Sequence, residues 1–367
     1  MPRTHQRRAW KRLLVASACA ATVALSGFRP FTDAMRLPHL SSARAMQPER
    51  LGELELFLQG VAMQLRSGDK AIRESAMNII STYGYEILRS DLLTGMAVKG
   101  LSGLVRNGDR NEQWLAVMAL GHMKCPAAVP AFIEALKSGD EDIQVRAAQA
   151  LGELGDPRAY PQLIIALHSE YSTVRGYAAW ALGEIGDEKA IPALIEATED
   201  GDSEVRGNAA HALGTIGKAN PKNPGLLKAV PVLIGLLDDD LCPQVRIYSA
   251  WSLGELKDKR AILPLVNAVA DEREDHLVLV RAQAAEALGK LGDPRTVFLL
   301  LDALKDEDHV VRIYAAMGLG FLGDKRALPA LAKAAGSDPD KEVRASAKKA
   351  MDEISKPDPK EENPKKD

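Results

Sequence analysis

Residues 174–187 read Val-Arg-Gly-Tyr-Ala-Ala-Trp-Ala-Leu-Gly-Glu-Ile-Gly-Asp, and this phrase recurs along most of the chain. The glycine at its tenth position returns in steps of 31, 31, 31, 40, 35 and 31 residues, at Gly121, Gly152, Gly183, Gly214, Gly254, Gly289 and Gly320. Weaker copies begin at Ile72 and Val343. A period near 31 residues is typical of a solenoid of helical pairs. We therefore predict an all-α fold that binds along a surface rather than in one pocket.

Each copy of the phrase reads as two helices. Four apolar residues fall on one face of a 3.6-residue helix, namely Val174, Ala178, Leu182 and Ile185. Gly186 then ends that helix in a left-handed conformation, and Pro192 lies in the first turn of a second helix. A glycine inside a helix, such as Gly183, costs about 1 kcal/mol relative to alanine. Its recurrence therefore indicates that neighbouring helices approach closely.

The phrases at 174–187 and 280–293 resemble the HEAT-repeat family, and more narrowly its short type, first named from phycobilisome lyase subunits. The resemblance covers about residues 51–355. It implies a right-handed α-solenoid of about eight HEAT-like helical-pair repeats, with the helices of the phrase along the concave side. The family includes scaffolds, lyase subunits and one group of metal-dependent hydroxylases, so the resemblance leaves function open.

Outside the repeats we expect three further segments. Residues 1–28 combine a basic head with an apolar or small run, which is typical of an export signal or a membrane anchor. Residues 29–50 read as a linker, and residues 356–367 as a disordered charged tail. The chain is therefore expected to be exported, to a periplasmic or extracellular location. An uncleaved N-terminal anchor and targeting to an organelle are the alternatives.

The charge distribution bears on possible partners. Residues 1–50 carry nine Lys and Arg against two acids, so residues 51–367 carry 38 basic and 48 acidic side chains. Binding to nucleic acid without regard to sequence requires a basic stripe that neutralises phosphates. We therefore expect no nucleic-acid partner, and contact with a membrane only through an uncleaved N-terminal segment.

Motifs for catalysis are missing from the sequence. It has no Gly-x-Ser-x-Gly, no Cys-x-x-Cys and no Gly-rich phosphate loop. The family's hydroxylases carry His-Glu dipeptides that hold two irons, and this sequence has none. We predict that the chain is not an enzyme and has no catalytic residue, metal or cofactor. A chromophore-lyase-like or chaperone subunit stays an alternative, and a hydroxylase relative is less favoured.

The second position of the phrase is usually arginine. These arginines are Arg175, Arg206, Arg246, Arg281, Arg312 and Arg344. We interpret them as a structural ladder, in which acids three residues before the valine, such as Asp202, Asp308 and Asp340, pair with the arginines across loops. A ladder that binds anions is the alternative.

Positions 4, 7 and 11 of the phrase lie opposite the buried stripe. The candidate partner-binding residues at these positions are Tyr177, Trp180, Glu184, His211, Tyr248, Trp251, Glu255, Tyr314, Met317 and Phe321. Aromatic residues and methionine are enriched in interface cores. We predict a non-catalytic scaffold that binds a protein or peptide along this face, with Trp180 and Trp251 as hot spots whose truncation leaves stability nearly unchanged. The alternative is that the rings pack on one another inside the superhelix.

Overall fold

The computed structural model describes residues 61, 64–87, 91–271 and 278–356, which contain helices and no strand. The predicted signal, linker and nearly all of the charged tail lie outside these residues. Within the described ranges, no helix combines the length and apolar character needed to cross a membrane. The chain divides into two units, residues 1–147 and 148–367, with the division inside α7 (Glu141–Leu154).

The first unit contains α3 (Lys70–Ile87), α4 (Asp91–Asn107), α5 (Arg110–Met123) and α6 (Val129–Ala135), and it ends within α7. Both α3 and α4 pack against α5. Apolar side chains from these helices form the core, among them Met77, Ile80, Leu101, Leu120 and Phe132, all fully buried. The unit therefore has the helix-on-helix packing that the repeat predicts.

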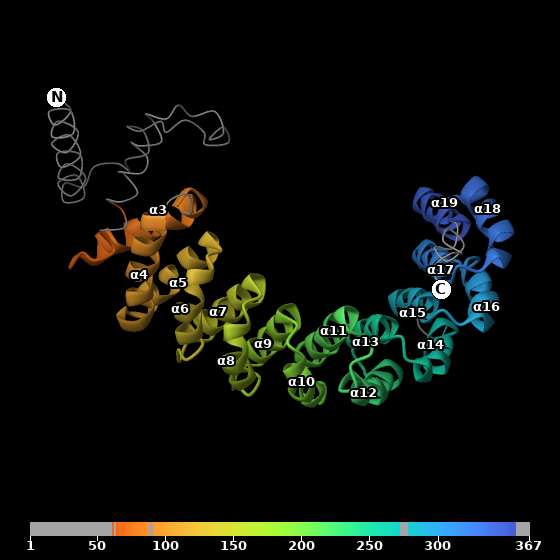
Figure 1. Cartoon of the computed structure of the whole chain (residues 1–367), viewed down its shortest axis with the longest axis horizontal. Helices are drawn as coiled ribbons and strands as arrows, with labels where there is room; N and C mark the ends of the chain where they lie inside the picture. The colour runs from red at the N-terminus through yellow and green to blue at the C-terminus, as the bar shows by residue number, and fades with distance from the viewer. Residues whose placement is uncertain (1–60, 62–63, 88–90, 272–277, 357–367) are drawn as a thin grey trace, which may run out of the picture. The chain divides into compact units, whose positions relative to one another are not determined.

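The second unit has two layers of helices (Figure 1). The inner layer consists of α9 (Ser172–Ile185), α11 (Ser203–Ala219), α13 (Pro243–Leu256), α15 (Val278–Leu291), α17 (His309–Leu322) and α19 (Lys341–Ser355). The outer layer consists of α8 (Tyr160–Ala166), α10 (Ile191–Ala197), α12 (Leu226–Asp239), α14 (Ile262–Val269), α16 (Val297–Ala303) and α18 (Leu328–Ser337). Each inner helix packs on the next inner helix and on the outer helix that precedes it in the chain. Figure 1 shows the inner layer on the inside of this unit's curve. The unit is an all-α solenoid.

The repeat at α9 and α10 shows why the phrase folds in this way. Val174, Ala178 and Leu182 are fully buried, as the helical spacing predicts. Gly186 ends α9 with a φ of 73°, in the left-handed region that favours glycine. Asp187 accepts a hydrogen bond from the backbone N–H of Lys189 and so opens a short 3₁₀ turn that leads into α10. The final Gly-Asp of the phrase therefore encodes the turn between the two layers.

The recurrent glycine lets the inner helices approach closely. A Cβ atom added to Gly183 would lie 2.7 Å from the Cα of Ala212 on the next inner helix. At Gly289, an added Cβ would lie 2.1 Å from the carbonyl oxygen of Gly318. Both separations are too short for real atoms, so a larger residue would push the helices apart. The predicted close approach is confirmed at these two positions.

Candidate partner-binding face

The arginines at the second position of the phrase form a ladder, but their partners differ from the prediction. Arg175 donates from Nε and Nη2 to the carboxylate of Asp200, at 2.7 and 2.8 Å, rather than to Asp202. Asp202 is the N-cap of α11, and its carboxylate accepts a hydrogen bond from the backbone N–H of Glu204. A carboxylate that caps a helix in this way satisfies backbone donors of the first turn. The pairing aspartate therefore lies two residues before the cap.

The other two acids named in the prediction are also helix caps. Asp308 accepts from the backbone N–H of Val310, and Asp340 accepts from those of Glu342 and Val343. Arg312 instead donates to the carboxylate of Asp338, at 3.0 Å from both Nε and Nη2.

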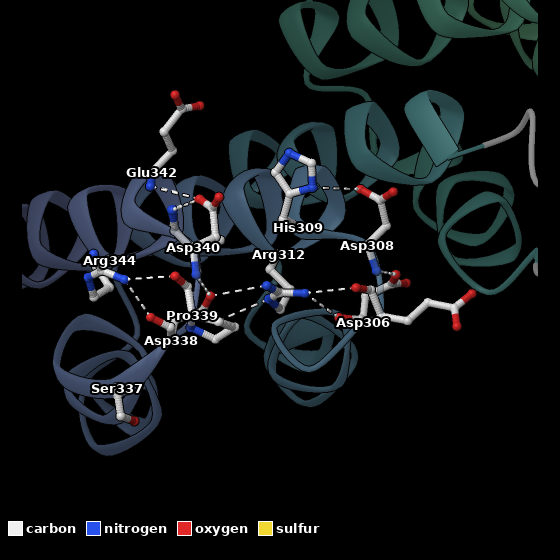
Figure 2. A network of polar contacts seen from close by, with 12 residues as sticks. Asp306, Asp308, His309, Arg312, Ser337, Asp338, Pro339, Asp340, Glu342 and Arg344 are labelled. Atoms are coloured by element: carbon white, nitrogen blue, oxygen red, sulfur yellow. Dashed lines mark hydrogen bonds and ion pairs between the residues drawn. The ribbon is translucent and has the colours of Figure 1, made fainter.

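The aspartates that pair with the ladder arginines also join consecutive repeats through their backbone carbonyl oxygens. Arg312 donates from Nη1 to the carbonyl oxygen of Asp306, and Arg344 donates to that of Asp338 (Figure 2). Asp338 therefore binds one arginine through its carboxylate and the next through its carbonyl oxygen. Asp200 does the same with Arg175 and Arg206. These charge-assisted bonds run from repeat to repeat, which supports the structural interpretation of the ladder.

The contacts of the ladder arginines differ along the second unit. Arg206 makes a two-bond contact with Asp240, at 2.7 and 3.0 Å. Arg246 donates to the carbonyl oxygen of Leu237, and its guanidinium lies 3.6 Å from Asp271. Arg281 is 3.3 Å from Asp306, and its buried Nε has no hydrogen-bond partner among the residues that the structure describes.

The candidate aromatic residues of α9, α11 and α13 form what we call the ring cluster: Tyr177, Trp180, His211, Tyr248 and Trp251. The imidazole of His211 stacks on Trp251, with centroids 4.7 Å apart and planes 17° apart. His211 also lies 5.3 Å from Tyr248, and Tyr177 meets Trp180 edge to face at 6.5 Å. All five side chains are partly buried. The ring cluster therefore consists of a pair of rings on α9 and a group of three rings that joins α11 to α13.

Both tryptophans also contact the preceding inner helix. A Cβ added to Gly152 would lie 2.5 Å from Cζ3 of Trp180, and one added to Gly214 would lie 2.6 Å from Cζ3 of Trp251. Each indole therefore covers the glycine of the repeat before it. The rings take part in packing between repeats and also keep part of their surface open to solvent. We therefore expect truncation of the tryptophans to lower stability, which differs from the expectation drawn from the sequence.

One carboxylate lies beside the ring cluster. Glu184, one turn after Trp180, is exposed. Burial lowers the pKa of His211, although the Glu184 carboxylate opposes this shift. The imidazole is therefore mainly neutral at pH 7, because its pKa lies below the usual value of about 6.5.

The remaining predicted residues lie in the neighbouring repeats. Glu255 is buried, at 9% exposure, although the helical pattern placed it opposite the core. It pairs with Lys290 of α15 at 2.7 Å. Phe321 of α17 is 55% exposed and lies under Lys290, whereas Tyr314 and Met317 are partly buried.

Two residues that sequence reasoning did not select belong to this face. Glu286 and Lys290 occupy positions 7 and 11 of α15 and form an ion pair of 3.1 Å. Gln283 donates to the buried carboxylate of Glu286 at 2.8 Å. The i,i+4 spacing of Glu286 and Lys290 was the signal in the sequence.

Surface hollows were also compared with the predicted site residues. Two shallow hollows lie in the first unit, one along α3 beside Glu74 and Asn78 and one between Leu65 and α4. No predicted site residue lines either of them. Among the described residues, no three His, Cys, Asp or Glu side chains gather at metal-binding distance.

Several solved structures are similar to this chain. A crystal structure of an engineered protein matches with a TM-score of 0.50 and 22% identity, over 85% of this chain and 92% of that one. Human deoxyhypusine hydroxylase in complex with glycerol matches with a TM-score of 0.34 and 24% identity, over 72% and 97%. The complex of CpcE and CpcF of phycocyanin lyase from Nostoc sp. matches with a TM-score of 0.45 and 28% identity, over 62% and 88%. The first shows a shared fold, and the other two carry no argument about activity. A search of curated proteins gave no significant match.

The repeats themselves match a known family. A family model described as HEAT repeats matches residues 98–176, 160–241, 230–312 and 274–352. These overlapping matches cover the inner and outer helices from α4 to α19, which is more than half of the chain. The chain therefore belongs to the HEAT-repeat family.

Proposed function

We propose that this protein is a non-catalytic scaffold that binds a protein or peptide along the inner layer of its second unit. HEAT repeats generally serve protein interactions, because a solenoid offers an extended surface rather than an enclosed pocket. The observation that carries the proposal is the ring cluster. Its aromatic side chains lie on the inner layer at positions 4 and 7 of the phrase, where most other repeats have polar residues.

The residue types of the ring cluster are those that contribute most to binding free energy at protein interfaces. Tryptophan and tyrosine dominate interface hot spots, because they bury a large area while losing few rotatable bonds. The rings of the cluster are already held by Gly152, Gly214 and each other, so little conformational entropy remains to be lost on binding. A rigid, partly open aromatic surface is suited to binding a partner.

The first test is partner capture from a native extract with the double variant Trp180→Ala, Trp251→Ala. We expect this variant to lose a partner that the unchanged protein retains, since truncating a hot-spot tryptophan costs roughly 2–4 kcal/mol of binding. Because the indoles also pack on the preceding repeat, its melting temperature should fall by several degrees, and capture is measured well below that temperature.

The matched control replaces exposed apolar residues of the outer layer. Leu263 and Phe298 are 68% and 63% exposed on α14 and α16. The double variant Leu263→Ala, Phe298→Ala should capture the partner as the unchanged protein does. Equal capture by the tryptophan variant, folded by circular dichroism, would contradict the proposal and leave the rings as packing between repeats.

A further inference from the structure

The face that contains the ring cluster has an acidic balance. Positions 4, 7 and 11 of α9, α11, α13, α15 and α17 carry three carboxylates, Glu184, Glu255 and Glu286, against one ammonium, that of Lys290. The ladder arginines of the same helices are engaged with aspartates and carbonyl oxygens of the loops. This face is therefore complementary to a cationic partner.

Lys290 shows how a cation fits on this face. Its Nζ lies 2.7 Å from Glu255, 3.1 Å from Glu286 and 5.5 Å from the centroid of the Phe321 ring. One cation is thus held by carboxylates and by an aromatic ring at once. The ring attracts the cation because its face carries negative charge density, and the attraction grows as water is excluded.

The ring cluster has aromatic rings and a neighbouring carboxylate, that of Glu184, as the Lys290 site does. Glu184 lies on the same helix as Tyr177 and Trp180 and close enough to His211 to affect its pKa. Among the described residues, no lysine or arginine forms an ion pair with Glu184. The exposed carboxylate and the neighbouring rings are therefore available to a cation from outside the chain.

We propose that Glu184 and the ring cluster bind an arginine-bearing, extended segment of a partner protein. This proposal rests on the proposed function and specifies the chemistry of the partner. A guanidinium is planar, so it stacks on tryptophan and tyrosine faces while it donates two hydrogen bonds to one carboxylate. An ammonium is a point charge that is more strongly hydrated, so lysine uses this surface less well.

The spacing of the repeats suits an extended chain. Packed helices lie about 8–10 Å apart, and an extended peptide advances about 3.3 Å per residue. An arginine at every third residue would therefore meet successive inner helices. A peptide of four Gly-Ser-Arg triplets is the probe that follows from this spacing.

The test measures binding of this fluorescein-labelled peptide to the full chain by fluorescence anisotropy. We expect saturable binding, and at least about tenfold weaker binding of the same peptide with citrulline in place of arginine. Citrulline keeps the planar shape and removes the charge. The lysine version should bind more weakly than the arginine version. Glu184→Gln should weaken arginine-peptide binding by about threefold or more.

Glu196→Gln is the matched control, because Glu196 is an exposed carboxylate on outer helix α10. It removes the same charge, but from the outer layer and not from the proposed site. We therefore expect it to leave the affinity for the arginine peptide unchanged. Equal losses from the two variants, equal binding of the lysine or citrulline peptide, or no binding of the arginine peptide would each overturn this inference. Tryptophan-dependent binding of a neutral or acidic peptide would overturn it while leaving the proposed function in place.

Discussion

Several helices of the phrase end on a residue in the left-handed conformation, and the residue type at that position decides the energetic cost. Gly155, Gly186, Gly292 and Gly323 have φ values of 61–73° there. Lys124 and Lys257 occupy the equivalent place after α5 and α13, with φ values of 47° and 53°. A side chain in the left-handed region costs of order 1 kcal/mol or more, because its Cβ crowds the backbone. These two lysines are therefore strained.

Replacing Lys257 with glycine should stabilise the protein by roughly 0.5–1 kcal/mol, after the larger chain entropy of glycine in the unfolded state is subtracted. Thermal melting followed by circular dichroism measures this change. Gly186→Ala is the opposite control and should lower the melting temperature. An unchanged or lower melting temperature for Lys257→Gly would contradict the assigned strain.

A second prediction at the residue scale concerns acid. The hydrogen bonds from Arg175 lower the pKa of Asp200 below its usual value, against the opposing effect of burial. Asp200 therefore stabilises the fold above the unfolded-state pKa of about 3.9, and this stabilisation is lost as pH falls below that value. We expect Asp200→Asn to lower the melting temperature at pH 7. Between pH 5 and pH 3, the melting temperature of this variant should fall less than that of the unchanged protein. Parallel pH profiles would contradict this role.

At the scale of elements, the close approach of the inner helices depends on small residues. Gly183 and Gly121 share one position of the phrase, but an added Cβ meets Ala212 at 2.7 Å in the first case and no atom within 4 Å in the second. Gly183→Ala should destabilise by roughly 1–3 kcal/mol through overpacking. Gly121→Ala should instead stabilise by up to about 1 kcal/mol, because alanine favours helix. Two shifts of the same sign in thermal melts would contradict this assignment.

Sequence periodicity was sufficient to predict the helical pairs, their turns and the stripe that they bury. It was wrong about the ladder's partners, because Asp200 and Asp202 precede the same helix and only the loop geometry decides which one caps it. The pattern likewise identified the residues of the ring cluster. It could not show that Trp180 covers Gly152 or that Glu255 is buried against Lys290, because both contacts depend on how closely adjacent repeats stack.

At the scale of the whole molecule, the basic residues of the first 50 positions contrast with the acidic remainder. We propose from this contrast and from the apolar run that the chain is exported and that its N-terminal signal is removed. Mass spectrometry of the protein isolated from cells should then find a new N-terminus after residue 26 or residue 45. Recovery of soluble protein that begins at Met1 or Pro2 would contradict export by cleavage.

The central claim is that the inner layer of the second unit meets the partner and that the outer layer does not. Site-specific photocrosslinking in the native cell tests it most directly, with benzoylphenylalanine in place of Glu184 on α9 or of Glu196 on α10. Both side chains are exposed, so either probe can react with a neighbouring protein. We predict a discrete adduct from position 184 and none from position 196. An adduct from position 196 alone, or the same adduct from both positions, would contradict it.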